Sequence, residues 1–233
     1  MSNQIVDALE QAFQDVRDRD ATLAERLSYI ADQVRALSSI FAEAVDTFVT
    51  RLEKTGAGKD APQIGDVMPG FMLPDDQGHL VSLDKLLEQA PVAMAFHRGH
   101  WCPYCRLSAV GLAEIQDDIK PVQIVAISAQ TQKFTRKIKA ESGAHFPFLT
   151  DFGNGYALSL NLAIWVDDAM SSLIAGAGWD IPSYQGETGW VLPIPSVFIV
   201  GQDGLIKARH VDADYRRRLE PADLRKAAMA ALA

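Results

Sequence analysis

The chain has 233 residues, of which 48% are hydrophobic and 22% are charged, and its formal net charge is −8. This length and balance suit one well-buried α/β domain with an appended segment. The acidic charge, without basic clusters interleaved with aromatic residues, argues against nucleic acid as a partner. The N-terminus lacks a secretory signal pattern and no apolar run approaches about 18 residues, so we expect a cytoplasmic protein with no membrane partner.

The first predicted segment, residues 1 to about 55, contains neither glycine nor proline and has helical periodicity. Thr22 followed by Glu25 matches a capping box, which predicts a short helix before Asp20 and a longer one after Ala21. This helical hairpin packs either on its own chain or against a second copy in a homodimer, and the two interpretations stay open. The longer helix carries a heptad seam of apolar residues: Leu23, Leu27, Ile30, Val34, Leu37, Phe41, Ala44 and Phe48.

The glycine-containing stretch 56–62 is typical of a linker. A domain boundary there divides the chain into an N-terminal helical segment, residues 1–58, and a second domain, residues 59–233. Short strands alternate with helices in the second domain, which predicts a mainly parallel sheet covered on both faces. The predicted elements are a hairpin of strands 71–73 and 79–81, a strand over 92–96, a helix over 103–119, a strand over 122–127, a helix over 132–140, a strand over 146–149, a short helix over 156–162, an antiparallel hairpin of strands 196–200 and 205–210, and a helix over 221–232.

The only two cysteines, Cys102 and Cys105, lie three positions apart where the strand over 92–96 leads into a helix. Residues at i and i+3 share one face of a helical turn, so the thiols can form and break a disulfide. Pro103 is favoured at the first helical position, which makes Cys102 the N-cap. Free N–H groups and the helix dipole stabilise a thiolate there, and Arg98 adds positive charge, so Cys102 is the predicted nucleophile.

Other roles for the cysteine pair are weaker. Inert core cysteines are usually scattered rather than paired around a proline. A metal site could also use His97 and His100, but structural zinc usually takes its ligands from two separated pairs, and this chain has one. A disulfide that closes so short a ring removes little chain entropy. In a reducing compartment the pair is therefore more typical of catalysis, and no metal or other cofactor is expected.

Residues 164–193 are rich in glycine and tryptophan and give no clear periodicity. An ordered surface insertion without a functional role is the more common outcome for such a stretch. The alternative is a lid over the active site.

From about Ile64 to the C-terminus the chain resembles the alkyl hydroperoxide reductase/thiol-specific antioxidant (peroxiredoxin) family of the thioredoxin-fold superfamily. The resemblance implies a thioredoxin-like, peroxiredoxin-type three-layer sandwich with a mixed central sheet, preceded here by the helical hairpin. It also implies a cis proline at Pro195 that faces the cysteines and docks a partner. The motifs that carry it are Ile64-Gly65-Asp66 with Pro69 and Phe71, the run Arg98-Gly99-His100-Trp101-Cys102, and Ile194-Pro195-Ser196-Val197-Phe198 before Gly201-Gln202-Asp203-Gly204.

Two departures from the peroxiredoxin pattern limit what the resemblance implies. Peroxiredoxins place a threonine three residues before the attacking cysteine, and alignment on Cys105 puts Cys102 there. The arginine that the family supplies before a late strand is also missing, with Arg98 or Arg209 as substitutes. The tetrapeptide Cys-Pro-Tyr-Cys instead matches glutaredoxin, and Trp101 before it matches thioredoxin.

These observations predict an antioxidant thiol oxidoreductase, with peroxide reduction narrowly favoured over disulfide reduction. Cys102 attacks the oxidant, Cys105 resolves the product, and a thioredoxin- or glutathione-type donor reduces the resulting disulfide. Alignment with peroxiredoxins reverses the two cysteine roles. Arg98 is expected to lower the thiol pKa, Trp101 to shield the site from water, and Pro195 to dock the partner. The alternatives are a thioredoxin- or glutaredoxin-like protein disulfide reductase and a non-catalytic redox sensor or adaptor.

Overall fold

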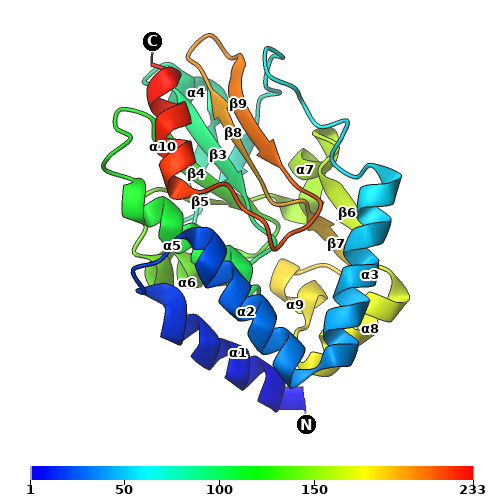
Figure 1. Cartoon of the computed structure of the whole chain (residues 1–233). Coiled ribbons are helices and arrows are strands. Elements are labelled where there is room, and N and C mark those ends of the chain that lie inside the picture. The colour runs from blue at the N-terminus through cyan, green and yellow to red at the C-terminus, as the bar shows by residue number, and fades with distance from the viewer. Residues whose placement is uncertain (1, 233) are drawn as a thin grey trace.

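The centre of the molecule is a mixed sheet, which lies among helices in Figure 1. The structure is a computed structural model that describes residues 2–232. Its strands are β3 (Val92–Phe96), β4 (Gln123–Ser128), β5 (Phe148–Thr150), β8 (Ser196–Val200) and β9 (Ile206–Val211). Within the described residues these five strands are ordered β5-β4-β3-β8-β9. Strands β3, β4 and β5 are parallel, and β8 is antiparallel to both β3 and β9. The predicted mixed sheet is confirmed.

Helices cover both faces of this sheet, which makes it the middle of three layers. Side chains alternate along β3, so Ala93 and Ala95 face one side and Met94 and Phe96 the other. The first side packs on α5 (Pro103–Ile115), α6 (Gln132–Ser142) and α10 (Pro221–Ala230), and the second on α4 (Leu83–Leu87) and α7 (Gly155–Ser159). Every residue of β3 is buried, as expected for a strand covered on both faces.

The smaller elements complete the domain near their predicted positions. β1 (Met72–Pro74) and β2 (Leu80–Ser82) form the predicted antiparallel hairpin. A 3-10 turn, η1 (Phe152–Asn154), precedes α7. Among the described helices, none combines the length and the hydrophobicity that crossing a lipid bilayer requires.

The N-terminal segment begins with the predicted helical hairpin and then departs from the prediction. Helices α1 (Ser2–Arg17) and α2 (Leu23–Leu37) form the hairpin, and the predicted capping box is present at Thr22. The second helix does not continue past Leu37, because Ser38 is extended, with φ −158° and ψ 101°. Its hydroxyl accepts the N–H of Phe41 at 3.1 Å and so caps a third helix, α3 (Ser39–Thr55). Serine is a favoured N-cap, which explains the break.

The heptad seam packs on its own chain. Leu23, Leu27 and Ile30 are buried in a cluster that also contains Phe13 of α1 and Phe48 of α3. The same cluster includes both cysteines, so the N-terminal helices lie directly over the start of α5 (Figure 1). Formation of a homodimer stays a prediction.

The insertion between α7 and β8 is ordered, as predicted, but it is not a free surface excursion. It consists of β6 (Ala163–Trp165), α8 (Asp168–Ala177), α9 (Ile181–Gln185) and β7 (Val191–Pro193), with β6 and β7 antiparallel. Helix α8 contacts α1 and α3. The insertion and the N-terminal helices thus meet over the cysteines.

Candidate active site

The cysteine turn, residues 97–105, leads from the end of β3 into the first turn of α5. Cys102 is the N-cap, with φ −92° and ψ 112°, and Pro103 is the first helical residue, as predicted. Gly99 has φ +144°, and a Cβ at this position would lie 2.7 Å from the side chain of Gln130, so only glycine fits. The N–H of Cys105 donates to the Cys102 carbonyl at 3.0 Å, which holds both cysteines on one turn.

The two thiols are free and buried, but their surroundings differ. Cys102 is 1% exposed and Cys105 is 0% exposed. The Cys105 sulfur accepts a hydrogen bond from the backbone N–H of Arg98 at 3.3 Å and another from Nη2 of Arg218 at 3.5 Å. The Cys102 side chain makes no capping hydrogen bond to the helix N–H groups. Cys105 is therefore the sulfur that receives the hydrogen bonds.

The pKa values of the two thiols follow this difference. Burial raises the pKa of Cys102 well above its ordinary value, and the thiol–thiolate hydrogen bond to Cys105 raises it further. Burial also acts against ionisation of Cys105, but the hydrogen bond from Cys102 and the charges of Arg218 and Arg98 lower its pKa well below the ordinary value. These directions and the two hydrogen bonds favour Cys105 as the thiolate, whereas the sequence predicts it at Cys102, whose sulfur makes no capping hydrogen bond to the helix N–H groups. Which sulfur carries the charge stays a prediction.

Two arginines supply the positive charge: Arg98, which is buried, and Arg218, which is partly buried. The Arg98 guanidinium lies 3.8 Å from the centre of the Tyr215 ring and 4.9 Å from that of Trp101. Burial lowers the pKa of His97 to about 4, so this ring is neutral at pH 7 and leaves the charge to Arg98 and Arg218. Sequence reasoning missed Arg218, whose only signal is the charged run that follows the last strand.

The other proposed substitute, Arg209, does not reach the sulfurs. Its guanidinium donates to the side chain of Gln63 and to the carbonyl of Gly58. Arg209 lies on the edge strand β9 and holds the linker onto the sheet.

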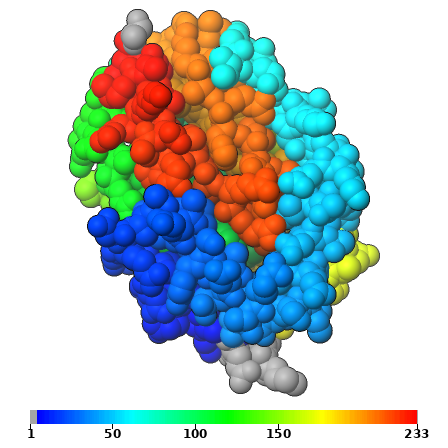
Figure 2. All heavy atoms as spheres, viewed as in Figure 1, coloured from blue at the N-terminus to red at the C-terminus, as the bar shows by residue number. Residues whose placement is uncertain are grey.

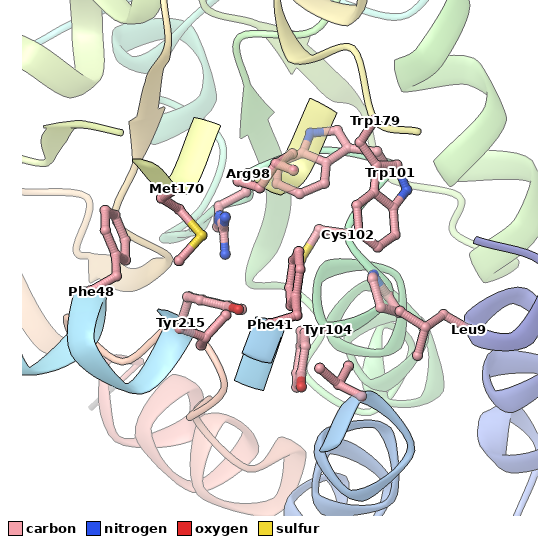
Figure 3. A pocket seen from close by; sticks show the side chains of 14 residues that line it. Leu9, Phe41, Phe48, Arg98, Trp101, Cys102, Tyr104, Met170, Trp179 and Tyr215 are labelled. Carbon is pink, nitrogen blue, oxygen red and sulfur yellow. The ribbon is translucent and has the colours of Figure 1, made fainter. Parts of the chain in front are cut away.

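An apolar cavity of about 40 Å³ adjoins Cys102 (Figure 3). Because a water molecule needs at least about 10–15 Å³ by this measure, there is room for only a few small molecules. Cys102, Arg98 and Trp101 form one wall. The N-terminal helices and the insertion form the others, through Leu9, Phe41, Phe48, Met170, Ile174 and Trp179. Trp101 thus lies where it was predicted to shield the site.

Pro195 departs from the geometry that the resemblance implies. The Ile194–Pro195 peptide bond is trans, and the cis bond found within residues 2–232 is Lys120–Pro121. The N–H of Ile194 donates to the Leu162 carbonyl at 2.7 Å, and β8 begins directly after Pro195, so the chain runs extended through this proline. Pro195 is buried and is not part of the cavity wall. Its role in docking a partner stays a prediction.

The two histidines of the turn, His97 and His100, pack against aromatic side chains. His97 lies against Phe148, and His100 stacks on Phe134 with 6.2 Å between ring centres. Over residues 2–232, no group of three or more histidine, cysteine, aspartate or glutamate side chains is arranged to hold a metal ion.

A sequence profile described as the AhpC/TSA family matches residues 64–209. The chain belongs to this family. The comparison with curated proteins found no match. The AhpC/TSA match contains both cysteines and leaves out α1, α2, α3 and Arg218.

Solved structures with the same fold include three from peroxiredoxin-related proteins. Peroxidoxin BcpB from Mycobacterium tuberculosis is 18% identical with a TM-score of 0.55, and the match covers 73% of this chain and 98% of that one. Peroxiredoxin 6 of Arenicola marina is 17% identical with a TM-score of 0.56, covering 72% of each chain. A peroxiredoxin-like protein from Aquifex aeolicus is 10% identical with a TM-score of 0.57, covering 73% and 88%. These similarities confirm the predicted peroxiredoxin-type fold.

Proposed function

We propose that this AhpC/TSA member is a thiol peroxidase that reduces a small peroxide with the Cys102–Cys105 pair. The observation that carries the proposal is the narrow apolar cavity of about 40 Å³ against Cys102. A peroxide group of two oxygen atoms fits such a space, whereas the disulfide of a folded protein does not reach a sulfur that is 1% exposed. Family membership and the thiolate beside two arginines support the same reading.

The first chemical step begins from a pair that shares one proton and one negative charge. A peroxide in the cavity meets Cys102, which passes its proton to the Cys105 thiolate. The Cys102 thiolate attacks the nearer peroxide oxygen, the O–O bond breaks, and the departing alkoxide or hydroxide takes the proton from Cys105. The products are a sulfenic acid on Cys102, an alcohol or water, and a restored thiolate on Cys105.

Arg98 is suited to this step. Its Nε and Nη1 atoms are buried and have no hydrogen-bond partner among the described residues. The guanidinium lines the cavity together with Cys102 (Figure 3). Donors placed where negative charge develops lower a reaction barrier, so Arg98 stabilises the leaving oxygen. Trp101 forms the adjoining wall and limits the entry of water.

The second step forms the disulfide. The Cys105 thiolate attacks the sulfur of the Cys102 sulfenic acid, the S–S bond forms, and the S–O bond breaks with loss of hydroxide, which is protonated to water. A thioredoxin- or glutathione-type donor then supplies two electrons and two protons and regenerates the thiols. Because both sulfurs are buried, the covering helices must move before this donor can reach the disulfide.

Trapping of the intermediate tests the proposal. Reduced protein is mixed with hydrogen peroxide, and the reaction is followed by tryptophan fluorescence and by dimedone labelling with mass spectrometry. Cys105→Ser should accumulate sulfenic acid on Cys102, slowly at pH 7 because the base is lost, and faster as the pH rises. Cys102→Ser should stay unlabelled. Labelling of Cys105 in the second variant alone would reverse the roles, and a wild-type protein inert to peroxides would overturn the proposal.

A second candidate is the reduction of a small disulfide. It is supported by the Cys-Pro-Tyr-Cys turn, in which Cys102 is the N-cap residue and lines the cavity. Faster reaction with a glutathione mixed disulfide than with any peroxide would favour this function. Insulin, as a protein disulfide, should react slowly in either case. A non-catalytic redox sensor predicts oxidation of the pair without turnover when a reducing system is supplied.

A further inference from the structure

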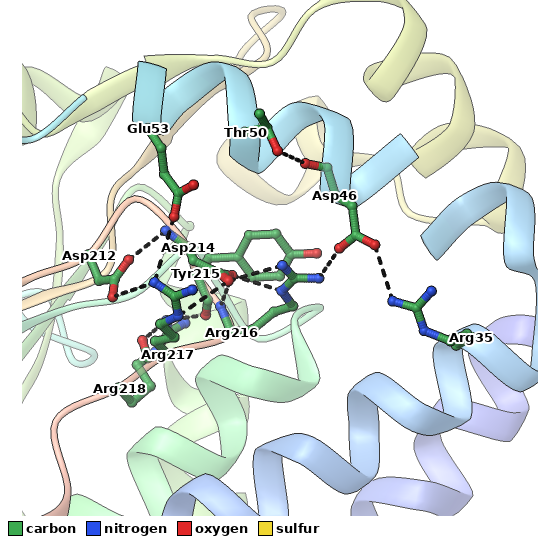
Figure 4. A network of polar contacts seen from close by, with 10 residues as sticks. All are labelled: Arg35, Asp46, Thr50, Glu53, Asp212, Asp214, Tyr215, Arg216, Arg217 and Arg218. Carbon is green, nitrogen blue, oxygen red and sulfur yellow. Dashed lines mark hydrogen bonds and ion pairs between the residues drawn. The ribbon is translucent and has the colours of Figure 1, made fainter. Parts of the chain in front are cut away.

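The segment between β9 and α10 joins the N-terminal helices to the thiolate site. We call residues 212–218 the arginine loop, because Arg216, Arg217 and Arg218 are consecutive in it. Figure 2 shows this orange-red segment lying between the blue and cyan N-terminal helices. Figure 4 shows its polar contacts with α3. The loop lies outside the AhpC/TSA match, which ends at residue 209.

Arg216 fastens the loop to α3. Its Nη1 donates to Oδ1 of Asp46 at 2.6 Å, and its Nε and Nη2 donate to the two carboxylate oxygens of Asp214 at 2.8 and 3.0 Å (Figure 4). Asp214 is buried and also accepts the backbone N–H of Arg216 at 3.1 Å. The second oxygen of Asp46 accepts from Arg35 of α2 at 3.1 Å. The loop is therefore braced internally and attached directly to α3, and Asp46 in turn links this contact to α2.

A second attachment lies on the other side of Arg218. The carboxylate of Glu220 accepts the backbone N–H groups of Leu23 at 3.1 Å and Ala24 at 2.7 Å, in the first turn of α2. A carboxylate is favoured at a helix N-terminus. The chain is thus held by the N-terminal helices two residues before Arg218 and two residues after it.

Arg218 is the residue that these attachments position. Its Nη2 is 3.5 Å from the Cys105 sulfur, and its Nη1 donates to the backbone carbonyls of Tyr215 and Arg217 within the loop. A guanidinium tied to its own loop moves with that loop. The distance between Arg218 and the sulfur therefore depends on how firmly the loop is attached.

We propose that Asp46 is a positioning residue for the thiolate: acting through Arg216, it lets helix α3 hold Arg218 against Cys105. The inference rests on the thiolate described under Proposed function and is independent of which oxidant the pair uses. It makes the N-terminal helices part of the active site's electrostatics as well as part of its wall.

Linkage gives the proposal a second consequence. If docking of α3 stabilises the thiolate, then the thiolate stabilises docking of α3 by the same free energy. Formation of the Cys102–Cys105 disulfide removes the negative charge, and Arg218 then faces a neutral sulfur. The arginine loop and α3 are held less firmly in the oxidised protein, which is the state in which a donor must reach the buried disulfide.

The first test is the thiolate absorbance at 240 nm as a function of pH. Asp46→Asn should raise the apparent pKa of the thiol pair by about 0.5–1 unit, because the charge of Arg218 is less well placed. Asp46→Glu, which keeps the carboxylate, should have a pKa close to that of the wild type. Asp167→Asn is the matched control. It makes the same change in charge, breaks an ion pair of α3 that does not involve the arginine loop, to Arg51, and keeps an N-cap on α8. Equal shifts in the two Asn variants, or none in either, would overturn the proposal.

The second test is hydrogen exchange of α3 before and after oxidation with diamide, which takes up the two electrons and two protons that the thiols lose. Backbone amides of α3 should exchange several-fold faster in the oxidised protein, and Asp46→Asn should remove most of this difference. Equal exchange in the two redox states would contradict the coupling. Neither test measures peroxide reduction, so a protein that fails to reduce peroxides yet passes both tests overturns the proposed function alone.

Discussion

The segment that matches the AhpC/TSA family and the segments that flank it contribute different things to one site. The family segment supplies both sulfurs, the helix start that carries them and Arg98. The flanking segments supply Arg218, which touches Cys105, and the N-terminal helices, which form part of the cavity wall beside Cys102 together with the insertion of the family segment. The comparison indicates that the family fold can position the two cysteines while segments outside it influence their ionisation and their exposure to solvent.

The largest expected effect concerns whether the two regions unfold together. Phe13 of α1 is 0% exposed and belongs to the apolar cluster that contains Trp101 and both cysteines. Phe13→Ala should lower the free energy of unfolding by about 3–5 kcal/mol, through lost burial and a remaining cavity. Urea unfolding followed by far-UV circular dichroism and by tryptophan fluorescence should give one coincident transition.

The control for Phe13→Ala is Ile40→Ala, since Ile40 is 71% exposed at the start of α3. This change should stay within about 0.5 kcal/mol. A separate early transition in Phe13→Ala would break the comparison, because the helices would then be an independent unit resting on the family domain.

The second prediction concerns the charge that the flank supplies. Arg218→Met removes the guanidinium beside Cys105 and should raise the pKa of the thiol pair. The rate of reaction with hydrogen peroxide at pH 7 should fall about 10- to 100-fold, since a shift of one pKa unit corresponds to a factor of about ten. The measurement is stopped-flow tryptophan fluorescence between pH 5 and 9.

Arg218→Lys, which keeps a positive charge, should lie between wild type and Arg218→Met. The rates of all three proteins should converge at high pH, where the pair is ionised without help from the arginine. Equal rates for the three proteins at pH 7 would show that the family segment lowers the pKa of the thiol pair without help from Arg218.

The smallest effect is expected at Glu10, on the outside of the contact between α1 and α5. Its hydrogen bond from Arg106 lowers the pKa of this carboxyl to about 2, against burial, which acts in the other direction. A lowered folded-state pKa stabilises the fold at pH values above the unfolded pKa, and this contribution is lost as the pH falls from about 4.5 to about 2.

Glu10→Gln should therefore destabilise the protein at pH 7 by at most about 1 kcal/mol, because the glutamate side chain is 50% exposed. The difference from wild type in urea unfolding should vanish near pH 2. Glu43→Gln, the same substitution at an exposed position on α3, is the control and should change little. A difference between Glu10→Gln and wild type that persists unchanged at pH 2 would contradict the ion-pair explanation.

Local patterns in the chain predicted much of the family segment. The apolar run Val92–Phe96 forms β3 with the predicted limits, and the proline after Cys102 marks the start of α5 as expected. The capping box at Thr22 is also present. Hydrophobic periodicity and cap preferences act over a few residues, so they can be read directly from the order of the amino acids.

The break at Ser38 was missed for a different reason. The apolar seam runs past this residue with an unbroken heptad spacing, so periodicity alone favours one long helix. The chain instead uses the serine hydroxyl to start α3, which brings Phe48 over the cysteine turn. Packing against the rest of the molecule outweighs the local pattern there.

The chemistry of the pair was predicted as far as its residues and their spacing allow. The order of the amino acids predicts a redox pair at Cys102 and Cys105, at the start of a helix. Which sulfur holds the charge depends on Arg218, 113 positions away along the chain, and on an N–H group that points at Cys105. Electrostatic stabilisation depends on distances through space in a buried site, and those distances exist only once the flanking segments have folded against the family domain.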